Sequence, residues 1–307
     1  PDPAAIVLGQ HATQESMEAW REANGLNDPI VIQYIDFIKG ALTGDLGTSY
    51  YTKTPVTQEI ISRFPATVEL AVVAIILASV LGIAIGVISA VRKNSIFDNG
   101  GMLLSLVGVS IPIFWLGILL IILFSGTLHW LPSTGRIDPA LRPDTITGFM
   151  IIDSILTGNT EALVDALRHM VLPAITLSLY SMAIIARMTR SSMLETLNQD
   201  YIRTARAKGV PEKKVNKRHA LRNAMLPVAT VIGLQLVSLL GGAVLTESVY
   251  SWPGIGNYTV QCIMKSDFPV VQGVVLLIAV IFVLMNLIVD VIYAFLDPRI
   301  KYAKKEA

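Results

Sequence analysis

The sequence predicts an all-α, polytopic membrane protein, and three features carry that prediction. Only 15% of the 307 residues are charged and 53% are hydrophobic, whereas soluble domains carry about 25% charged residues. Five apolar stretches approach or exceed the roughly 20 residues that cross about 30 Å of hydrocarbon. Basic residues gather in alternate connections between these stretches, as they do in the cytoplasmic loops of membrane proteins.

Residues 1–63 are mixed and polar, and we expect them to form a small helical cap outside the membrane. Asp28 is suited to cap a helix, with Pro29 in its first turn. Apolar residues from 31 to 42 then recur at helical spacing, and Gly44 can end that helix. The cap therefore precedes the first apolar stretch as a separate unit.

The membrane domain is expected over residues 64–296. Its predicted spans cover 66–91, 100–127, 170–188, 226–246 and 271–296. Pro112 interrupts the second span near its middle. It either kinks a helix packed against neighbours or breaks one that lines a cavity, as happens in transporters.

Four residues in these spans are candidates for lining a translocation path. Asp290 lies about two turns inside the last span, where an acid is a functional candidate by default. A structural pairing with a neighbouring helix is favoured over proton transfer, because proton-coupled carriers need several deep acids. Glu69 and Glu247 fall near span ends, where water is expected to reach them. The path candidates are Pro112, Gln235, Ser238 and Asp290.

The distribution of basic residues orients the chain. The segment 187–222 holds ten of the 24 Lys and Arg residues, and the tail 297–307 is also basic. Positive loops stay in the cytoplasm, so residue 215 and the C-terminal tail are expected inside, and residue 145 and the cap outside. Five spans satisfy this arrangement, and a sixth span upstream of residue 1 would return the N-terminus to the cytoplasm.

Residues 199–227 are the most polar and basic stretch, with apolar segments on both sides. Tyr201, Ile202 and Ala205 share one face of a short predicted helix. Gly209 is suited to the left-handed conformation that closes a helix, and Pro211 to the first turn of a second one. The pattern predicts a helix, a tight turn and a second helix at the membrane surface. A solvated basic loop that only fixes topology is the alternative.

Part of this stretch resembles the EAA loop of ABC-importer permeases. Arg203-Thr204-Ala205, Gly209 and Leu226-Pro227 carry the likeness, with Arg-Thr in place of Glu-Ala and a longer gap before Leu-Pro. Both departures are typical of the dipeptide/oligopeptide/nickel branch. Gly44-Asp45-Leu46-Gly47 and Trp252-Pro253-Gly254 are also similar to that branch. The resemblance covers nearly the whole chain and is nearest to the first, or "B", permease subunit of a dipeptide-type system.

The resemblance implies a type I importer transmembrane domain in the bacterial inner membrane, with a coupling loop over 190–225 and a cytoplasmic C-terminus. It implies a second homologous permease, two ABC ATPase subunits and an extracytoplasmic solute-binding protein as partners. ATP and Mg would be bound by the ATPases, and dipeptides or oligopeptides would be carried; nickel, glutathione or another solute is the alternative. The implied coupling residues are Tyr201, Ile202, Arg203, Thr204, Ala205, Ala207, Gly209, Leu226 and Pro227.

Other functional classes find little support in the sequence. There is no Gly-x-x-x-x-Gly-Lys-Ser/Thr loop to cradle phosphates and no nucleophile or metal motif of an enzyme. The four histidines are scattered, and the single cysteine, Cys262, cannot form an intrachain disulfide. A secondary transporter would need internal repeats and several deep ionisable residues. We therefore expect a transport subunit that binds no cofactor or metal and is not itself an enzyme.

Overall fold

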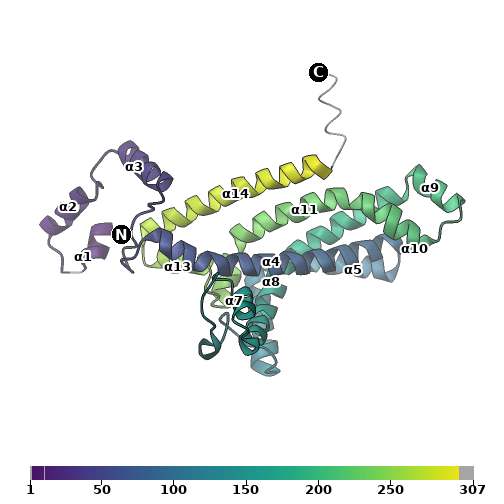
Figure 1. Ribbon diagram of the computed structural model, residues 1–307, viewed down its shortest axis with the longest axis horizontal. Coiled ribbons are helices and arrows are strands. Elements are labelled where there is room, and N and C mark those ends of the chain that lie inside the picture. The colour runs from purple at the N-terminus through teal and green to yellow at the C-terminus, as the bar shows by residue number, and fades with distance from the viewer. Residues whose placement is uncertain (1, 10, 297–307) are drawn as a thin grey trace, which may run out of the picture.

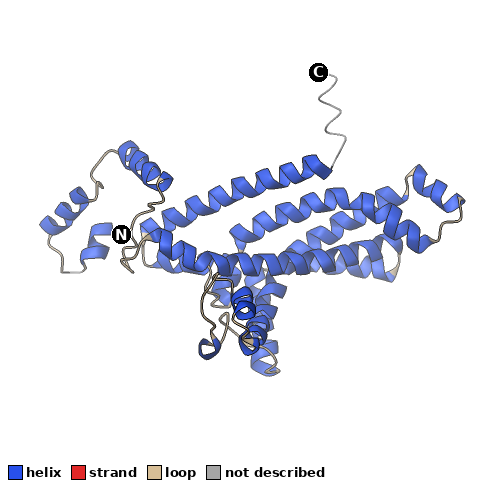
Figure 2. Cartoon of the chain, viewed as in Figure 1, coloured by secondary structure: helices blue, strands red, loops and turns tan. Residues whose placement is uncertain are grey.

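The computed structural model describes residues 2–9 and 11–296, and this part of the chain is built from helices without a β-strand (Figure 2). The long helices run along the long axis of the molecule (Figure 1). The cap helices lie at one end, and the short helices α9 (Asp200–Ala207) and α10 (Glu212–Lys214) lie at the opposite end. The architecture agrees with the predicted all-α membrane protein.

Four helices are long and apolar enough to cross a membrane, and a bent pair could supply a fifth span. The four are α4 (Val56–Val91), α8 (Thr160–Leu197), α11 (Leu221–Gly242) and α14 (Phe268–Leu296). The helical segment that contains α11 begins at Glu212 and runs through α10 (Glu212–Lys214) and a π-helix (Val215–Ala220). The predicted spans match these helices, but α4 and α8 continue well beyond the hydrocarbon length at their ends.

The predicted second span is a bent pair of helices. Helix α5 (Ile96–Ser110) and helix α6 (Ile113–Leu120), which continues as a π-helix (Ile121–Thr127), meet at an angle of 103°. Pro112 is the N-cap of α6, and Ile111 before it is extended. Proline disfavours helical backbone in the residue before it and donates no hydrogen bond of its own. The sequence was compatible with either a kinked or a broken helix at Pro112, and the structure shows a broken one.

The cap comprises α1 (Pro3–Leu8), α2 (Gln14–Ala23) and α3 (Ile30–Leu42). The expected N-cap at Asp28 is wrong by one residue: Pro29 occupies that position without a side-chain cap. The carbonyl of Asp28 instead accepts a hydrogen bond from the Gln33 side chain at 2.8 Å. Gly44 follows α3 with φ of +86°, as expected for the residue that ends a helix.

The cap is joined to the membrane helices by Asp267, which immediately precedes α14. Its buried carboxylate accepts hydrogen bonds from the Ser49 hydroxyl at 2.5 Å and from the Tyr50 backbone amide at 2.9 Å. The Tyr50 ring in turn packs edge-on against Trp20 of α2, with 5.6 Å between centroids. A single acid therefore ties the segment between the cap and α4 to the start of the last long helix.

The core of the bundle lies between α4 and α8, which small residues bring close together. A Cβ atom on Gly82 would lie 2.8 Å from the carbonyl oxygen of Met182, and one on Gly86 would lie 2.6 Å from that of Ala186. Those distances are shorter than van der Waals contact, so only glycine fits at either position. Small residues allow this approach in membranes, where helix association depends on close packing.

Shorter elements pack against the long helices. They are a 3-10 turn (Pro139–Leu141), α7 (Met150–Leu156), α12 (Val244–Val249) and α13 (Ile255–Met264). Helix α7 with the loop before it projects from the side of the bundle (Figure 1). Between α4 and α7, the Arg136 guanidinium donates two hydrogen bonds to the Glu69 carboxylate, at 3.0 and 2.5 Å. Glu69 is 7% exposed and Arg136 8%, so the expectation that water reaches Glu69 is wrong. The acid instead fixes the connection between α6 and α7 against α4.

Candidate coupling site and translocation path

Helix α9 (Asp200–Ala207) forms where the sequence predicts the first short helix. Ile202 is fully buried and Ala205 is partly buried, so the predicted inward face is present. Tyr201 is 43% exposed and does not share that face. Its hydroxyl instead accepts a hydrogen bond from the Asn223 side chain at 2.7 Å. Successive helical residues point about 100° apart, and the buried stripe is too narrow to include both Tyr201 and Ile202.

A compact apolar cluster anchors this helix to the bundle. Helices α4, α8 and α11 contribute residues to the cluster, and Ile202 of α9 packs among them. Its buried members are Ala90, Met193, Ile202, Val215, Ala220 and Ala224. The cluster therefore joins α9 to residues of α4, α8 and α11.

The turn after α9 is a Schellman motif. The amide of Gly209 donates to the carbonyl of Arg206 at 2.9 Å, and the amide of Val210 donates to that of Ala205 at 3.2 Å. Gly209 has φ of +75°, the left-handed value that this motif needs. An added Cβ atom there would have no neighbour within 4 Å. The glycine is therefore required by backbone conformation and not by lack of space.

Charged side chains bridge the turn on its exposed side. The Arg206 guanidinium bonds the carboxylate of Glu212 at 2.7 Å, which links α9 to α10. Arg203 makes a longer, exposed pair with Asp200 at 3.4 Å. The hydroxyl of Thr204 is used within the helix, where it donates to the carbonyl of Asp200. Arg203 therefore keeps an exposed cationic side chain on the outer side of α9.

The remaining predicted coupling residues do not all lie on α9. Ala207 is in its last turn and exposed. Leu226 and Pro227 lie inside α11, where Leu226 is half-buried and Pro227 exposed. Ala224, close to that proline, accepts a hydrogen bond from the Ser192 hydroxyl of α8 at 2.9 Å through its carbonyl. The Leu-Pro pair thus lies within α11, well after the turn that follows α9.

The predicted path residues fall on three different elements. Pro112 is exposed at the break between α5 and α6, and Gln235 and Ser238 lie one turn apart on α11. The Ser181 hydroxyl of α8 donates to the Gln235 side-chain carbonyl at 3.0 Å, whereas Ser238 is exposed. Asp290 is within α14, but its side chain lies outside the described residues. Of the described candidates, Gln235 is therefore tied to a neighbouring helix.

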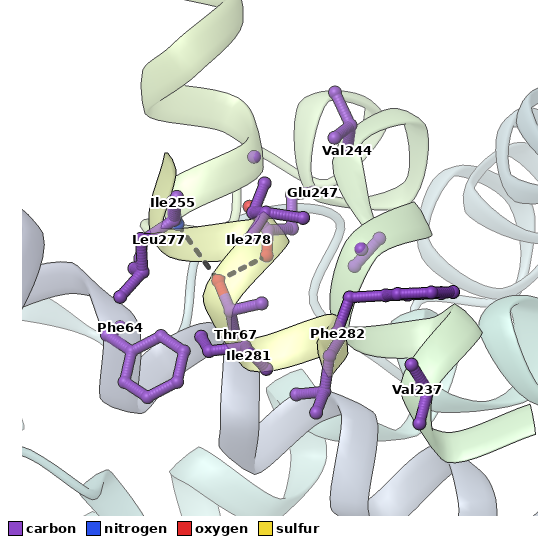
Figure 3. A pocket seen from close by; sticks show the side chains of 14 residues that line it. Phe64, Thr67, Val237, Val244, Glu247, Ile255, Leu277, Ile278, Ile281 and Phe282 are labelled. Atoms are coloured by element: carbon purple, nitrogen blue, oxygen red, sulfur yellow. Dashed lines mark hydrogen bonds between the residues drawn. The ribbon is translucent and has the colours of Figure 1, made fainter. Parts of the chain in front are cut away.

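Sequence reasoning missed the role of Glu247 on α12. It was expected near water, yet the structure buries it completely. The Thr67 hydroxyl donates to Glu247 Oε1 at 2.7 Å (Figure 3). The Asn257 amide donates to Oε2 at 2.9 Å. No Lys or Arg lies within ion-pair distance among the described residues. Burial raises the pKa of this carboxyl group, although the hydrogen bonds oppose that effect.

Figure 3 shows that Glu247 and Thr67 line a small cavity with otherwise apolar walls. Its volume is about 30 Å³, which exceeds the roughly 10–15 Å³ that one water needs. Thr67 Oγ1 also accepts a hydrogen bond from the Ile255 amide at 2.9 Å. A three-element junction of α4, α12 and α13 therefore depends on one hydroxyl and one buried acid.

The Trp-Pro-Gly stretch explains how the acid comes so close to the backbone. A Cβ atom on Gly256 would lie 2.9 Å from Glu247 Oε2, and one on Gly254 would overlap the carboxyl group. Trp252, itself fully buried, donates its indole N–H to the Ala66 carbonyl of α4 at 2.9 Å. The spacing of this stretch from Glu247 was visible in the sequence, but it did not reveal the partner on α4.

No group of three or more His, Cys, Asp and Glu side chains able to hold a metal ion occurs within the described residues. Glu69, Asp98 and Glu247 instead make hydrogen bonds or ion pairs to neighbouring elements. These contacts connect helices to one another. At one end of the bundle, α9 packs against three long helices through Ile202. Away from that end, the buried Glu247 joins α4 to α12 and α13.

Two family models match the chain. The model described as "Binding-protein-dependent transport system inner membrane component" matches residues 82–302. A second, for the N-terminal part of such membrane components, matches residues 1–71. Together the two matches include both the cap and the long helices.

Curated relatives match over nearly the full length. The dipeptide transport system permease protein DppB of Escherichia coli (strain K12) is 48% identical over 309 residues, covering 99% of this chain and 91% of that protein. The di/tripeptide transport system permease protein DppB of Pseudomonas aeruginosa (strain UCBPP-PA14) is 45% identical over 304 residues, with coverages of 99% and 90%. The probable D,D-dipeptide transport system permease protein DdpB of E. coli (strain K12) is 45% identical over 300 residues, with coverages of 97% and 88%.

Solved structures share the fold at much lower identity. A chain of the MetNI methionine ABC transporter in an inward-facing conformation superposes with a TM-score of 0.56 at 18% identity, covering 76% of this chain and 93% of that one. A chain of an amino acid ABC transporter with histidines gives a TM-score of 0.52 at 14% identity, with coverages of 79% and 94%. The arrangement of long helices is therefore similar to that of ABC-transporter chains.

Proposed function

This chain belongs to the family of binding-protein-dependent transport system inner membrane components, and from this we propose that it is a permease subunit of an ATP-driven importer of dipeptides or oligopeptides. Identity of 45–48% to dipeptide and di/tripeptide permeases over nearly the whole chain carries the proposal. The shared arrangement of helices with chains of ABC transporters supports the transport mode.

In this proposal α9 is the helix that docks on an ATPase subunit. Its Schellman turn and the Arg206–Glu212 pair hold it at a fixed angle to α10. Ile202 connects it to an apolar cluster with residues from α4, α8 and α11. A push on the exposed side of α9, where Arg203 and Ala207 lie, would therefore be transmitted to three membrane helices at once.

The proposed partners follow from the family and from the two ends of the molecule. Two ATPase subunits would bind ATP and Mg, because no phosphate-cradling loop is present in the sequence of this chain. A second, homologous permease would complete the translocation path, and a solute-binding protein would deliver peptide at the cap end. The basic segment 187–222 and the basic tail support a cytoplasmic location for the α9 end and the C-terminus.

Pro112, Gln235, Ser238 and Asp290 remain candidates for the path. Exposed Ser238 and half-buried Gln235 lie one turn apart on α11 and could meet polar peptide groups. The break at Pro112 fits a transporter, where irregular backbone lines cavities. Coupled movement of α9 would alter which end of this path is open.

Uptake into proteoliposomes tests the proposal. The chain would be reconstituted with a second permease, two ATPase subunits and a solute-binding protein, with labelled dipeptide outside the vesicle and ATP inside. We expect ATP-dependent accumulation of the dipeptide that competing dipeptides suppress. Accumulation of a nickel chelate or of glutathione, without dipeptide uptake, would assign the chain to another solute of the same family.

A further inference from the structure

A groove with an apolar floor and a cationic rim lies at the α9 end of the bundle. It is an open cavity of about 510 Å³, within the range of ligand sites. Its floor comes from the last turn of α4 and from α5 and α11, and its rim from α10 and the π-helix after it. The lining residues are Val87, Ile88, Val91, Arg92, Phe97, Lys213, Asn216, Lys217 and Leu221.

The floor is apolar surface that the chain itself leaves uncovered. Ile88 is 48% exposed, Val91 44% and Phe97 59%. These residues lie at the end of an apolar span, where a lipid chain begins and hydrocarbon meets the headgroup layer. A soluble ligand would leave such a floor partly wet, whereas an acyl chain would cover it.

The cations of the rim have no acidic partners. Arg92, Lys213 and Lys217 form no salt bridge within the described part of the chain, and Arg92 rests on the Phe97 ring at 4.6 Å. The acids that these elements carry nearby are engaged elsewhere: Asp98 binds Arg190, and Glu212 binds Arg206. The positive charge of the groove is therefore available to an external anion.

A second basic groove adjoins the first and shares Lys213 and Lys217 with it. It adds three cations, Lys214, Arg218 and Arg222, around Pro211. Five cations thus follow the chain within ten residues, immediately before the apolar part of α11. Clusters of this kind beside a span recognise anionic lipid headgroups.

We propose that the groove formed by α4, α5, α10 and α11 binds an anionic phospholipid. The headgroup phosphate lies between Arg92, Lys213 and Lys217, and one acyl chain covers Val91 and Phe97. The bound lipid would stabilise the start of α10, next to the turn that connects α9 to α10. The inference rests on the membrane orientation given under the proposed function, but not on the transported solute.

Lipid retention by the purified full chain tests the proposal. The chain is titrated in detergent with phosphatidylglycerol or phosphatidylcholine, and bound lipid is counted by native mass spectrometry. Wild type should retain phosphatidylglycerol preferentially. Each neutralised rim cation should weaken retention roughly fivefold, so Lys213→Gln with Lys217→Gln should weaken it by more than tenfold.

Lys93→Gln is the matched control, since Lys93 is an exposed cation at the same interface outside the groove. It should bind lipid like wild type, and a loss equal to that of the double variant would reduce the effect to diffuse surface charge. If the double variant does not fold, Val91→Trp fills the floor without changing charge and should also lower retention. Unchanged retention in Val91→Trp would overturn the proposal.

Two further outcomes would contradict a lipid. Displacement by excess inorganic phosphate would show that only the phosphate is recognised and that the apolar floor takes no part. Unchanged lipid retention together with lost binding of an ATPase subunit in the double variant would assign the groove to a protein partner. The titration needs neither ATP nor peptide, so its result is independent of whether dipeptide uptake is observed.

Discussion

The carboxylate of Asp98, at the start of α5, accepts two hydrogen bonds from the guanidinium of Arg190 on α8. The Nε–Oδ1 distance is 2.6 Å and the Nη2–Oδ2 distance is 2.8 Å. Asp98 is only 2% exposed, and the Asn94 amide donates a third bond at 2.9 Å. The pair fixes the connection between α4 and α5 against α8, close to the α9 end.

Removing the cation should cost more than removing the acid. Arg190→Gln leaves a buried carboxylate with the Asn94 amide as its one backbone donor, and we expect about 3–5 kcal/mol of destabilisation. Asp98→Asn keeps an acceptor for Asn94 and leaves Arg190, which is 26% exposed, able to reach water. Its melting temperature in detergent should therefore fall less. Equal losses in both variants would contradict this account of the pair.

The buried Glu247 predicts a pH dependence. Its pKa is raised in the folded protein by burial, so the folded state holds the proton more tightly than the unfolded state. The free energy of unfolding should therefore be higher below the pKa that Glu247 has in the folded protein. It should decrease as the pH rises through that pKa. Melting temperatures between pH 8 and pH 5 measure this slope.

Glu247→Gln is the matched control for that slope. The amide cannot titrate, and its oxygen can still accept from Thr67, although its NH₂ group meets the Asn257 amide unfavourably. The variant should have a flatter melting profile over the same pH range. A slope equal to that of wild type would assign the pH dependence to another group.

Much of the architecture follows from the sequence, because membrane spans are specified by local hydropathy. Four predicted spans lie largely on the long helices α4, α8, α11 and α14, and the second corresponds to the bent pair α5 and α6. The Gly209 turn was predicted with its conformation. What could not be predicted depends on tertiary contacts. Thr67 and Glu247 are 180 residues apart, and no local pattern pairs them. The choice of Ile202 over neighbouring Tyr201 as the buried residue depends on the width of the cluster it meets.

Topology can be tested by labelling single cysteines in a Cys262→Ser background. Thr145 is exposed and is predicted to be external. Val215 is fully buried, so the exposed neighbour Lys217 is the better cytoplasmic probe. An impermeant thiol reagent should label Thr145→Cys in intact spheroplasts and Lys217→Cys only after lysis. Labelling of both from one side would contradict the proposed orientation.

Ile202 should be the residue that anchors α9. Ile202→Ala removes a fully buried side chain, a change that costs about 2–5 kcal/mol in cores. A helix of eight residues has little stability of its own to absorb that loss. We expect normal membrane abundance with weakened stimulation of the complex's ATPase by loaded binding protein.

Arg203→Ala is the control for Ile202, because it removes an exposed contact from the same helix. It should reduce stimulation less than Ile202→Ala does. If the two substitutions are equally harmful, surface contact and not anchoring determines coupling. If Ile202→Ala is silent, the apolar cluster does not transmit movement from α9.

The central claim is that the turn at Gly209 aims α9 at its ATPase partner. Gly209→Val should cost about 1–2 kcal/mol or more, because a β-branched residue resists the left-handed conformation. Gly209→Asn should be tolerated, since asparagine adopts that conformation more readily and the surrounding space is open. Comparing the two variants therefore distinguishes the effect of backbone conformation at residue 209 from the effect of replacing a glycine with any larger residue.

The most direct measurement is ATPase activity of the reconstituted complex with and without peptide-loaded binding protein, with subunit stoichiometry determined on the same samples. The account predicts that Gly209→Val assembles normally but loses stimulation, while Gly209→Asn keeps most of it. Full stimulation in Gly209→Val would contradict the coupling role of the turn, and loss of the subunit from the complex would assign Gly209 to assembly instead.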